Sequence, residues 1–93
     1  MLIYISGPMT GLQDFNYPHF NRVAAELRSQ DHDVINPASC FEVSWLESIL
    51  RDIELVAQAD AIFLLRGWER SFGARIEKLV AEKFDLEILY EGR

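Results

Sequence analysis

The sequence predicts one α/β domain in which helices cover a four-stranded parallel sheet, in the order βαβαβαβ. Four short runs rich in isoleucine, leucine and valine alternate with three segments whose apolar residues recur at helical spacing. Such alternation favours parallel strands joined by right-handed crossovers. A chain of 93 residues is long enough for one small core, and no internal repeat or linker divides it. We therefore expect a single domain over residues 1–93.

Each predicted strand is a short apolar run that stops at a turn-forming residue. The first run begins at Leu2 and ends at Ser6, before the glycine- and proline-containing loop Gly7–Gly11. The second covers residues 33–36 and ends before Pro37, which cannot donate to a sheet ladder. The third and fourth strands are expected at residues 61–65 and 86–90.

The predicted helices begin at recognisable start signals. Pro18 suits the first turn of a helix that runs to about residue 30. Ser44 can cap the second helix, with Glu47 three residues later as in a capping box. Ser71 can cap a third helix over residues 72–84, because its hydroxyl can accept a free first-turn amide.

Apolar residues at helical spacing predict which side of each helix is buried. For the first helix this side holds Phe20, Val23, Ala24 and Leu27. For the second it holds Leu46, Ile49, Leu50, Ile53 and Val56. For the third it holds Phe72, Ile76, Leu79 and Val80.

Charge and composition narrow the classes of partner. The formal net charge of −6 argues against a nucleic-acid polymer or an anionic membrane as main partner, but it permits a small anionic ligand held by backbone amides. The single cysteine, Cys40, excludes an intrachain disulfide and fits a reducing cytoplasm. No histidine or basic cluster near Cys40 would activate it as a nucleophile. His19 and His32 have no metal-ligand spacing, so no metal site is expected.

The N-terminus and the apolar runs do not resemble targeting or membrane segments. No basic region precedes the short first apolar run, so we do not expect a signal peptide. No segment approaches membrane-spanning length. We expect a cytoplasmic protein.

Three loops are expected to meet beyond the carboxyl ends of the strands, where ligands bind in open parallel sheets. They are Gly7–Gly11, Asn36 with Pro37, and Gly67–Ser71. Gly7 and Gly11 can expose backbone amides to an anion, or they can serve only to shape a turn. The sequence therefore predicts where a ligand would bind but leaves the role of these glycines open.

Two aromatic residues and the first turn of the third helix are expected near these three loops. Trp68 can stack on a base or cover the end of the sheet. Tyr4, in a central strand, can offer its hydroxyl to the cleft or simply be buried. Gly73 and Ala74 leave the first turn of the third helix almost without side chains, so a ligand can approach its backbone.

Glu77 and Asp52 are the candidate carboxylates. Neither has a cation three or four residues away, so no helical ion pair explains them. Each lies at the edge of an apolar stripe, where an acid is either a site residue or a solvated surface charge. An apolar border raises the pKa of Glu77, whereas the helix N-terminus and the Ser71 and Tyr4 hydroxyls lower it. The net direction stays open.

These residues resemble a known family. The opening Ile3-Tyr-Ile-Ser-Gly7 resembles that of nucleoside 2-deoxyribosyltransferases and 2'-deoxynucleoside 5'-monophosphate N-glycosidases. Asp52, followed eight residues later by Asp60, is similar to their helix-to-strand segment. The stretch Ser71-Phe-Gly-Ala-Arg-Ile-Glu77 resembles their signature, in which a small polar or acidic residue precedes a glycine and the nucleophilic glutamate. The whole pattern is closer still to a small phage and prophage family of unknown function, which would place the protein in the host cytoplasm.

The resemblance implies a flavodoxin-like three-layer sandwich and an enzyme acting on the N-glycosidic bond of a nucleoside or nucleotide, without a cofactor. Glu77 would be the nucleophile, Tyr4 would orient it, and Asp52 would contact or protonate the leaving base. Ser71, with the amides of Gly7 and Gly73, would hold the sugar or its 5' substituent. The expected ligand-binding residues are Ser6, Gly7, Pro8, Gly11, Asn36, Trp68, Ser71 and Gly73.

The sequence departs from the family pattern in two places. The monophosphate hydrolases carry serine and arginine in the first loop, where this chain has Pro8 and Thr10. The chain also ends soon after its fourth strand, so a fifth strand and part of the pocket are expected to be missing. In the related enzymes a neighbouring subunit completes the site, and we expect a homodimer or a larger assembly. A catalytically silent nucleotide-binding module and a small structural protein with the same fold are the alternatives.

Overall fold

The computed structural model describes residues 1–39 and 44–92. Its strands are β1 (Leu2–Ser6), β2 (Asp33–Ile35), β3 (Ala61–Leu64) and β4 (Glu87–Tyr90), and its helices are α1 (Tyr17–Ser29), α2 (Trp45–Gln58) and α3 (Phe72–Lys83). Short helical turns η1 (Gln13–Asn16), η2 (Pro37–Ser39) and η3 (Trp68–Arg70) lie in the loops. The predicted order is confirmed. None of the helices in the described ranges is long and apolar enough to cross a bilayer.

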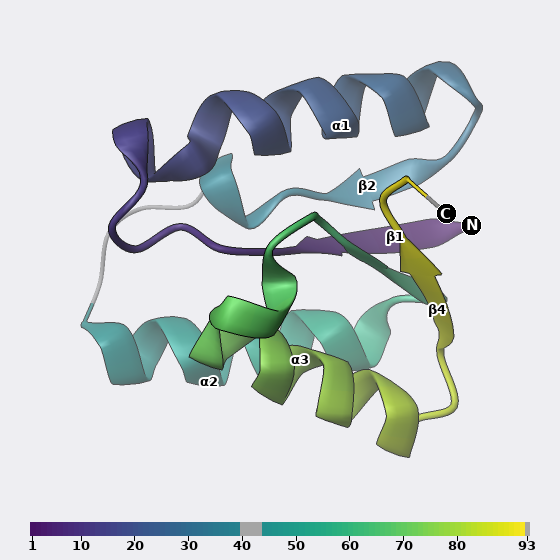
Figure 1. The fold of residues 1–93 in the computed structure, drawn as a ribbon. Coiled ribbons are helices and arrows are strands. Elements are labelled where there is room, and N and C mark those ends of the chain that lie inside the picture. The colour runs from purple at the N-terminus through teal and green to yellow at the C-terminus, as the bar shows by residue number, and fades with distance from the viewer. Residues whose placement is uncertain (40–43, 93) are drawn as a thin grey trace.

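The four strands form one parallel sheet in the order β2-β1-β3-β4. On β1, Tyr4 lies opposite Ile35 of β2 and Ile62 of β3. Figure 1 shows α1 on one face of the sheet and α2 with α3 on the other, which is the predicted three-layer sandwich. The strand order reverses between β1 and β3, and in open parallel sheets ligands bind at this reversal.

The face of the sheet beneath α1 carries an apolar core. Side chains alternate along a strand, so Ile3 and Ile5 of β1 face α1, whereas Tyr4 and Ser6 face the opposite helices. The predicted buried side of the first helix is confirmed, because its four apolar residues are all buried: Phe20, Val23, Ala24 and Leu27.

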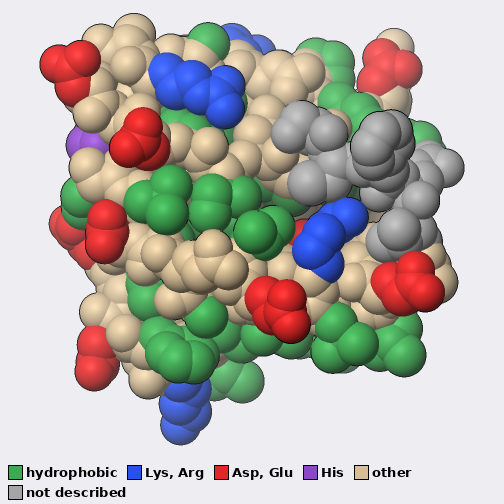
Figure 2. Space-filling model, turned by 180° about the vertical axis from the view of Figure 1, so that it is seen from behind, with side chains coloured by type: hydrophobic (Ala, Val, Ile, Leu, Met, Phe, Trp, Pro, Cys, Tyr) green, Lys and Arg blue, Asp and Glu red, His purple; other side chains and the backbone are tan. Residues whose placement is uncertain are grey.

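The face beneath α2 and α3 is built differently, and here the predicted stripes are only partly right, because Val56 is buried but other members of the stripes are not. Four large apolar side chains expected inside are more than half exposed: Leu46, Leu50, Phe72 and Leu79. Ala74, Glu77 and Ala81 are instead the buried residues of α3. The small alanine side chains let α3 lie close to the sheet. Glu77 accepts hydrogen bonds there from two hydroxyl groups of β1. Figure 2 shows hydrophobic side chains along the lower edge of the molecule, over the layer of α2 and α3.

Both predicted helix caps are confirmed. The Ser44 hydroxyl accepts a hydrogen bond from the Glu47 amide at 3.2 Å, and the Ser71 hydroxyl accepts one from the Ala74 amide, also at 3.2 Å. A serine cap pairs an amide that the helix itself cannot satisfy. The Ser71 cap therefore fixes where α3 begins, and with it the position of Glu77.

Candidate active site

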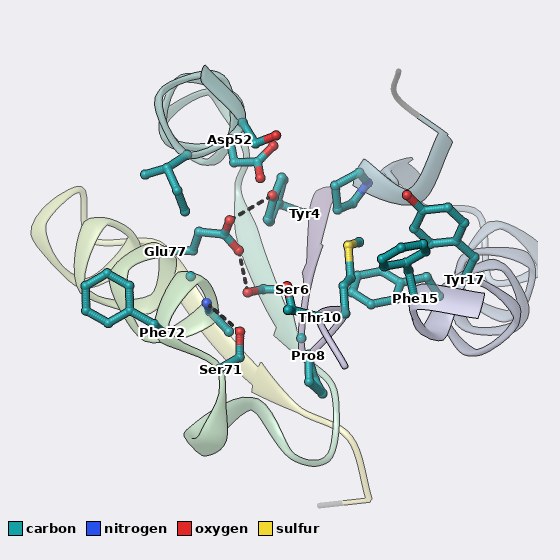
Figure 3. A pocket seen from close by; sticks show the side chains of 18 of the residues that line it. Tyr4, Ser6, Pro8, Thr10, Phe15, Tyr17, Asp52, Ser71, Phe72 and Glu77 are labelled. Carbon is teal, nitrogen blue, oxygen red and sulfur yellow. Dashed lines mark hydrogen bonds between the residues drawn. The ribbon is translucent and has the colours of Figure 1, made fainter. Parts of the chain in front are cut away.

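A cavity of about 690 Å³ lies at the carboxyl end of β1, where the strand order reverses. Figure 3 looks into it and shows Glu77 and Asp52 on one side, Phe15 and Tyr17 on the other, and Tyr4 with Ser6 between them. The first loop, η1, α1, α2 and the start of α3 all contribute to its lining, which includes Ser6–Thr10, Phe15, Tyr17, Phe20, Pro37, Ile49, Arg51, Asp52, Arg70–Ala74 and Glu77.

Glu77 is the central side chain of the cavity. It is only 6% exposed, and both of its carboxyl oxygens accept hydrogen bonds from β1. The Ser6 hydroxyl donates to Oε1 at 2.6 Å, and the Tyr4 hydroxyl donates to Oε2 at 3.3 Å. Tyr4 and Ser6 are two residues apart on a strand, so both point to the same face and hold the carboxyl group in one orientation.

Of the opposing influences on the pKa of Glu77, those that raise it are the stronger. Burial, together with the nearby Asp52 carboxyl, raises the pKa of Glu77 to about 8, because the hydrogen bonds from Ser6 and Tyr4 only partly offset these two influences. Glu77 therefore binds a proton much more readily than an exposed glutamate does. Burial also raises the pKa of Tyr4 well above its usual value, so its phenol remains a hydrogen-bond donor.

Asp52 faces the same cavity from α2. Burial raises its pKa, and the adjacent Arg51 guanidinium opposes that rise. Arg51 Nη2 lies 3.3 Å from Asp52 Oδ1, an ion pair between adjacent residues that a search at helical spacing does not reveal. Because Asp52 is less buried and has a cationic neighbour, it is the member of the acid pair that ionises more readily.

Close packing requires a glycine at position 7 and leaves little room for a Cβ atom at Gly73. A Cβ atom on Gly7 would lie 2.7 Å from Leu65 Cβ, and one on Gly73 would lie 3.3 Å from Ile49 Cδ1. Gly7 therefore lets the first loop cross the end of β3, and Gly73 lets α3 approach α2. Of the two roles that the sequence leaves open for Gly7, the structure shows that the residue shapes the loop. Gly7 also lines the cavity, where a ligand can reach it.

Three predicted ligand-binding residues are not part of the lining. Gly11 is exposed at φ +83°, and a Cβ atom there would meet nothing within 4 Å among the described residues. The Asn36 side chain donates to Asn21 Oδ1 at 2.9 Å and accepts from the Ala38 amide at 3.0 Å. Trp68 packs against Tyr90, with 6.1 Å between ring centroids, beside a separate cavity of about 230 Å³.

Predicted residues that do line the cavity are Tyr4, Ser6, Gly7, Pro8, Asp52, Ser71, Gly73 and Glu77. The sequence interpretation misses the aromatic side of the cavity, formed by Phe15, Tyr17 and Phe20. Residues 12–17 lie between the predicted first loop and the predicted first helix, and the aromatic residues on either side of Asn16 are the signal that could have found this side. Among the described residues, no group of three or more His, Cys, Asp or Glu side chains could hold a metal ion. Cys40 lies outside the described residues.

Comparison with known proteins gives a family for this chain and a solved structure of similar fold. The model of the family described as Domain of unknown function (DUF4406) matches residues 1–90. No curated protein matches the chain. Among solved structures, a 2-desoxiribosyltransferase from Leishmania mexicana is similar, with a TM-score of 0.78 and 22% sequence identity. The similarity covers 96% of this chain and 62% of that one, so this chain spans less than two thirds of its length.

At this identity the likeness concerns the fold, whereas the family match covers nearly the whole chain. The four-stranded parallel sheet with helices on both faces agrees with that likeness. The chain belongs to the DUF4406 family, and its fold is that of a 2-deoxyribosyltransferase.

Proposed function

We propose that this protein cleaves the N-glycosidic bond of a deoxynucleoside or deoxynucleotide, with Glu77 as the nucleophile. The observation that carries the proposal is a buried carboxyl group, oriented by two hydroxyls, in a cavity large enough for a small-molecule ligand. The similar fold of a 2-desoxiribosyltransferase supports the substrate class.

The reaction would follow the retaining glycosidase pattern. Glu77 attacks the anomeric carbon of the deoxyribose, a bond forms between a carboxylate oxygen and that carbon, and the bond to the base breaks. The electron pair of the broken bond stays on the base nitrogen. Water, or a second base, then attacks the same carbon, the bond to the Glu77 oxygen breaks, and free sugar or a new nucleoside leaves. The proton that the water or the second base loses returns to the acid pair Asp52 and Glu77, which restores the starting state.

The two carboxyl groups can supply the proton that the leaving base needs. In the ligand-free protein Glu77 holds a proton up to about pH 8, and Asp52 ionises more readily. Transfer of this proton through Asp52 to the base leaves Glu77 ionised, as a nucleophile must be. In many enzymes one carboxyl group acts as the nucleophile and another as the proton donor, because their environments give the two groups different pKa values. The first step then needs no other acid.

The remaining cavity residues have positioning roles in this proposal. Ser6 and Tyr4 orient Glu77, and Ser71 with the backbone of Gly7 and Gly73 holds the sugar or its 5' substituent. Pro8 forms part of the wall beside them. Gly11, Asn36 and Trp68 lie outside the lining, so no ligand contact is proposed for them.

The experiment is an incubation with a panel of deoxynucleosides and their 5'-monophosphates, scored for free base. Glu77→Gln, which keeps the side-chain shape, is the matched control. Base release by the wild type and not by the variant supports the proposal. Binding of a nucleotide by both proteins with no base released by either would instead favour a silent nucleotide-binding module.

We further propose that two copies of the chain associate through α2 and α3. Leu46, Leu50, Phe72 and Leu79 are each more than half exposed on these helices, and Phe72 also lines the cavity. A second copy there would cover this apolar surface and narrow the cavity entrance. Sedimentation should therefore detect a dimer that Leu50→Ser with Leu79→Ser weakens. Leu12→Ser, at an exposed position just before η1, should not weaken it. A wild-type monomer at high concentration would contradict the proposal.

A further inference from the structure

The turn η1 has an unusual backbone. Three consecutive residues that are not glycine have positive φ: Asp14 at 51°, Phe15 at 52° and Asn16 at 64°. A Cβ atom makes this left-handed conformation unfavourable, and a large aromatic residue such as Phe is poorly suited to it. Asn tolerates it better than most residues. Strain of this kind persists only where the surroundings hold it, and it is concentrated at functional sites.

Hydrogen bonds fasten the turn to the first loop. The Asn16 side chain donates from Nδ2 to the Pro8 carbonyl at 3.0 Å. The Phe15 amide donates to the Leu12 carbonyl at 3.0 Å, and the Leu12 amide donates to the Met9 carbonyl at 3.2 Å. Pro8 and Met9 themselves line the cavity, so the strained turn is tied directly to the cavity wall.

This arrangement holds the Phe15 ring in the cavity wall. The ring centroid lies 5.9 Å from that of Tyr17, with a tilt of 38°, and both side chains line the cavity. Phe15 is nevertheless 50% exposed. Without a ligand, this arrangement is unfavourable in free energy for two reasons: half of a large apolar side chain stays in water, and its backbone is strained. A flat ring lying on it would recover part of that cost.

We infer that Phe15 is the residue on which the base of the ligand stacks. This assignment rests on the proposed function for the identity of the ring. Glu77 must attack the anomeric carbon from the side opposite the departing base, and Figure 3 shows Phe15 and Tyr17 across the cavity from Glu77. A base on the aromatic side can place its face on Phe15 and turn an edge toward Asp52. An aromatic face recognises any base, so Phe15 supplies affinity and little choice among bases.

Phe15→Gly separates a binding role from a structural one. Glycine adopts positive φ freely, so the variant should melt no earlier than the wild type. Its affinity for free adenine and thymine should fall by about 5-fold to about 100-fold, while binding of 2-deoxyribose should not change. Phe15→Trp should keep the affinity for both bases. Phe15→Asn, which also tolerates this backbone, provides a second test of the loss.

Phe84→Gly is the matched control. Phe84 is 59% exposed, has φ −95° and does not line the cavity, so its variant should bind bases as the wild type does. Undiminished base affinity in Phe15→Gly, or an equal loss of 2-deoxyribose binding, would overturn the inference. So would the absence of base binding by the wild type at millimolar concentrations. If base binding depends on Phe15 but no nucleoside or nucleotide is cleaved, the proposed function fails and the stacking role stands.

Discussion

The two faces of the sheet are built for different purposes. Beneath α1 the contacts are between ordinary apolar side chains, and the residues that the sequence marks as buried are buried. Beneath α2 and α3 a second apolar cluster is buried, but alanines, an acid and two hydroxyl-bearing residues also face inward, and several large apolar side chains face outward. The α1 face therefore serves mainly stability, and the opposite face combines an apolar core with a carboxyl group that is held at the end of β1.

Glu77→Gln should break the site without breaking the fold. The amide cannot act as a nucleophile, so we expect base release to fall by roughly 1,000-fold or more. The side-chain shape is kept, and the buried hydroxyls of Ser6 and Tyr4 retain a partner. Base release and melting temperature should be measured together. A variant that keeps its activity would remove Glu77 from the chemistry, and one that unfolds would assign it to the core.

Asp52→Asn should slow the reaction more than it weakens binding. Asparagine cannot pass a proton to the departing base, and general acid catalysis typically contributes ~100-fold to ~10,000-fold. The measurements are kcat and KM across a range of pH, with a good leaving group as a second substrate. The loss should be smaller for the better leaving group. Equal turnover by the variant and the wild type would assign Asp52 a structural role.

A matched pair of leucines tests the stability half of the comparison. Leu27 on α1 is 7% exposed, and Leu79 on α3 is 56% exposed. Leu27→Ala should lower the free energy of unfolding by about 2–5 kcal/mol, whereas Leu79→Ala should change it by about 0.5 kcal/mol or less in the monomer. Denaturant titration of dilute protein measures both values. Similar losses for the two variants would mean that both faces serve stability equally.

The pH dependence of stability should carry the signature of Glu77. Its carboxyl ionises near 4.5 when unfolded but only near 8 in the folded chain, so folding holds an extra proton between these values. This contribution to stability is complete below about pH 4.5 and declines as pH rises, until it is lost above about pH 8. The decline is a few kcal/mol at most. Melting curves should show it as a difference between the wild type and Glu77→Gln, and parallel curves would argue against the raised pKa.

The sequence was sufficient for the fold because alternating strand and helix patterns and two serine caps agree with one topology. It was also sufficient to predict which side of α1 is buried, because this helix has a single apolar stripe. On α3 it was not, because Phe72, Ile76 and Leu79 form one possible inner side and Ala74, Glu77 and Ala81 form another. The hydroxyls of Tyr4 and Ser6, which are distant in sequence, pair with Glu77 on the second of these sides. Phe15 was not assigned because Asp14 and Asn16 are only weak signals for a left-handed turn, and the aromatic residues around Asn16 were not used as a signal for this side.

Glu91, just after β4, links three segments so that local unfolding of one affects the other two. Its carboxylate accepts the Arg66 amide at 2.8 Å and pairs with His19 Nε2 at 2.7 Å, so one side chain joins the ends of β3 and β4 to the start of α1. Partial burial works against the charge of Glu91, but these partners outweigh it and lower the pKa. Hydrogen exchange in these three segments should therefore speed up together when Glu91 is replaced by Gln, because they open as one unit.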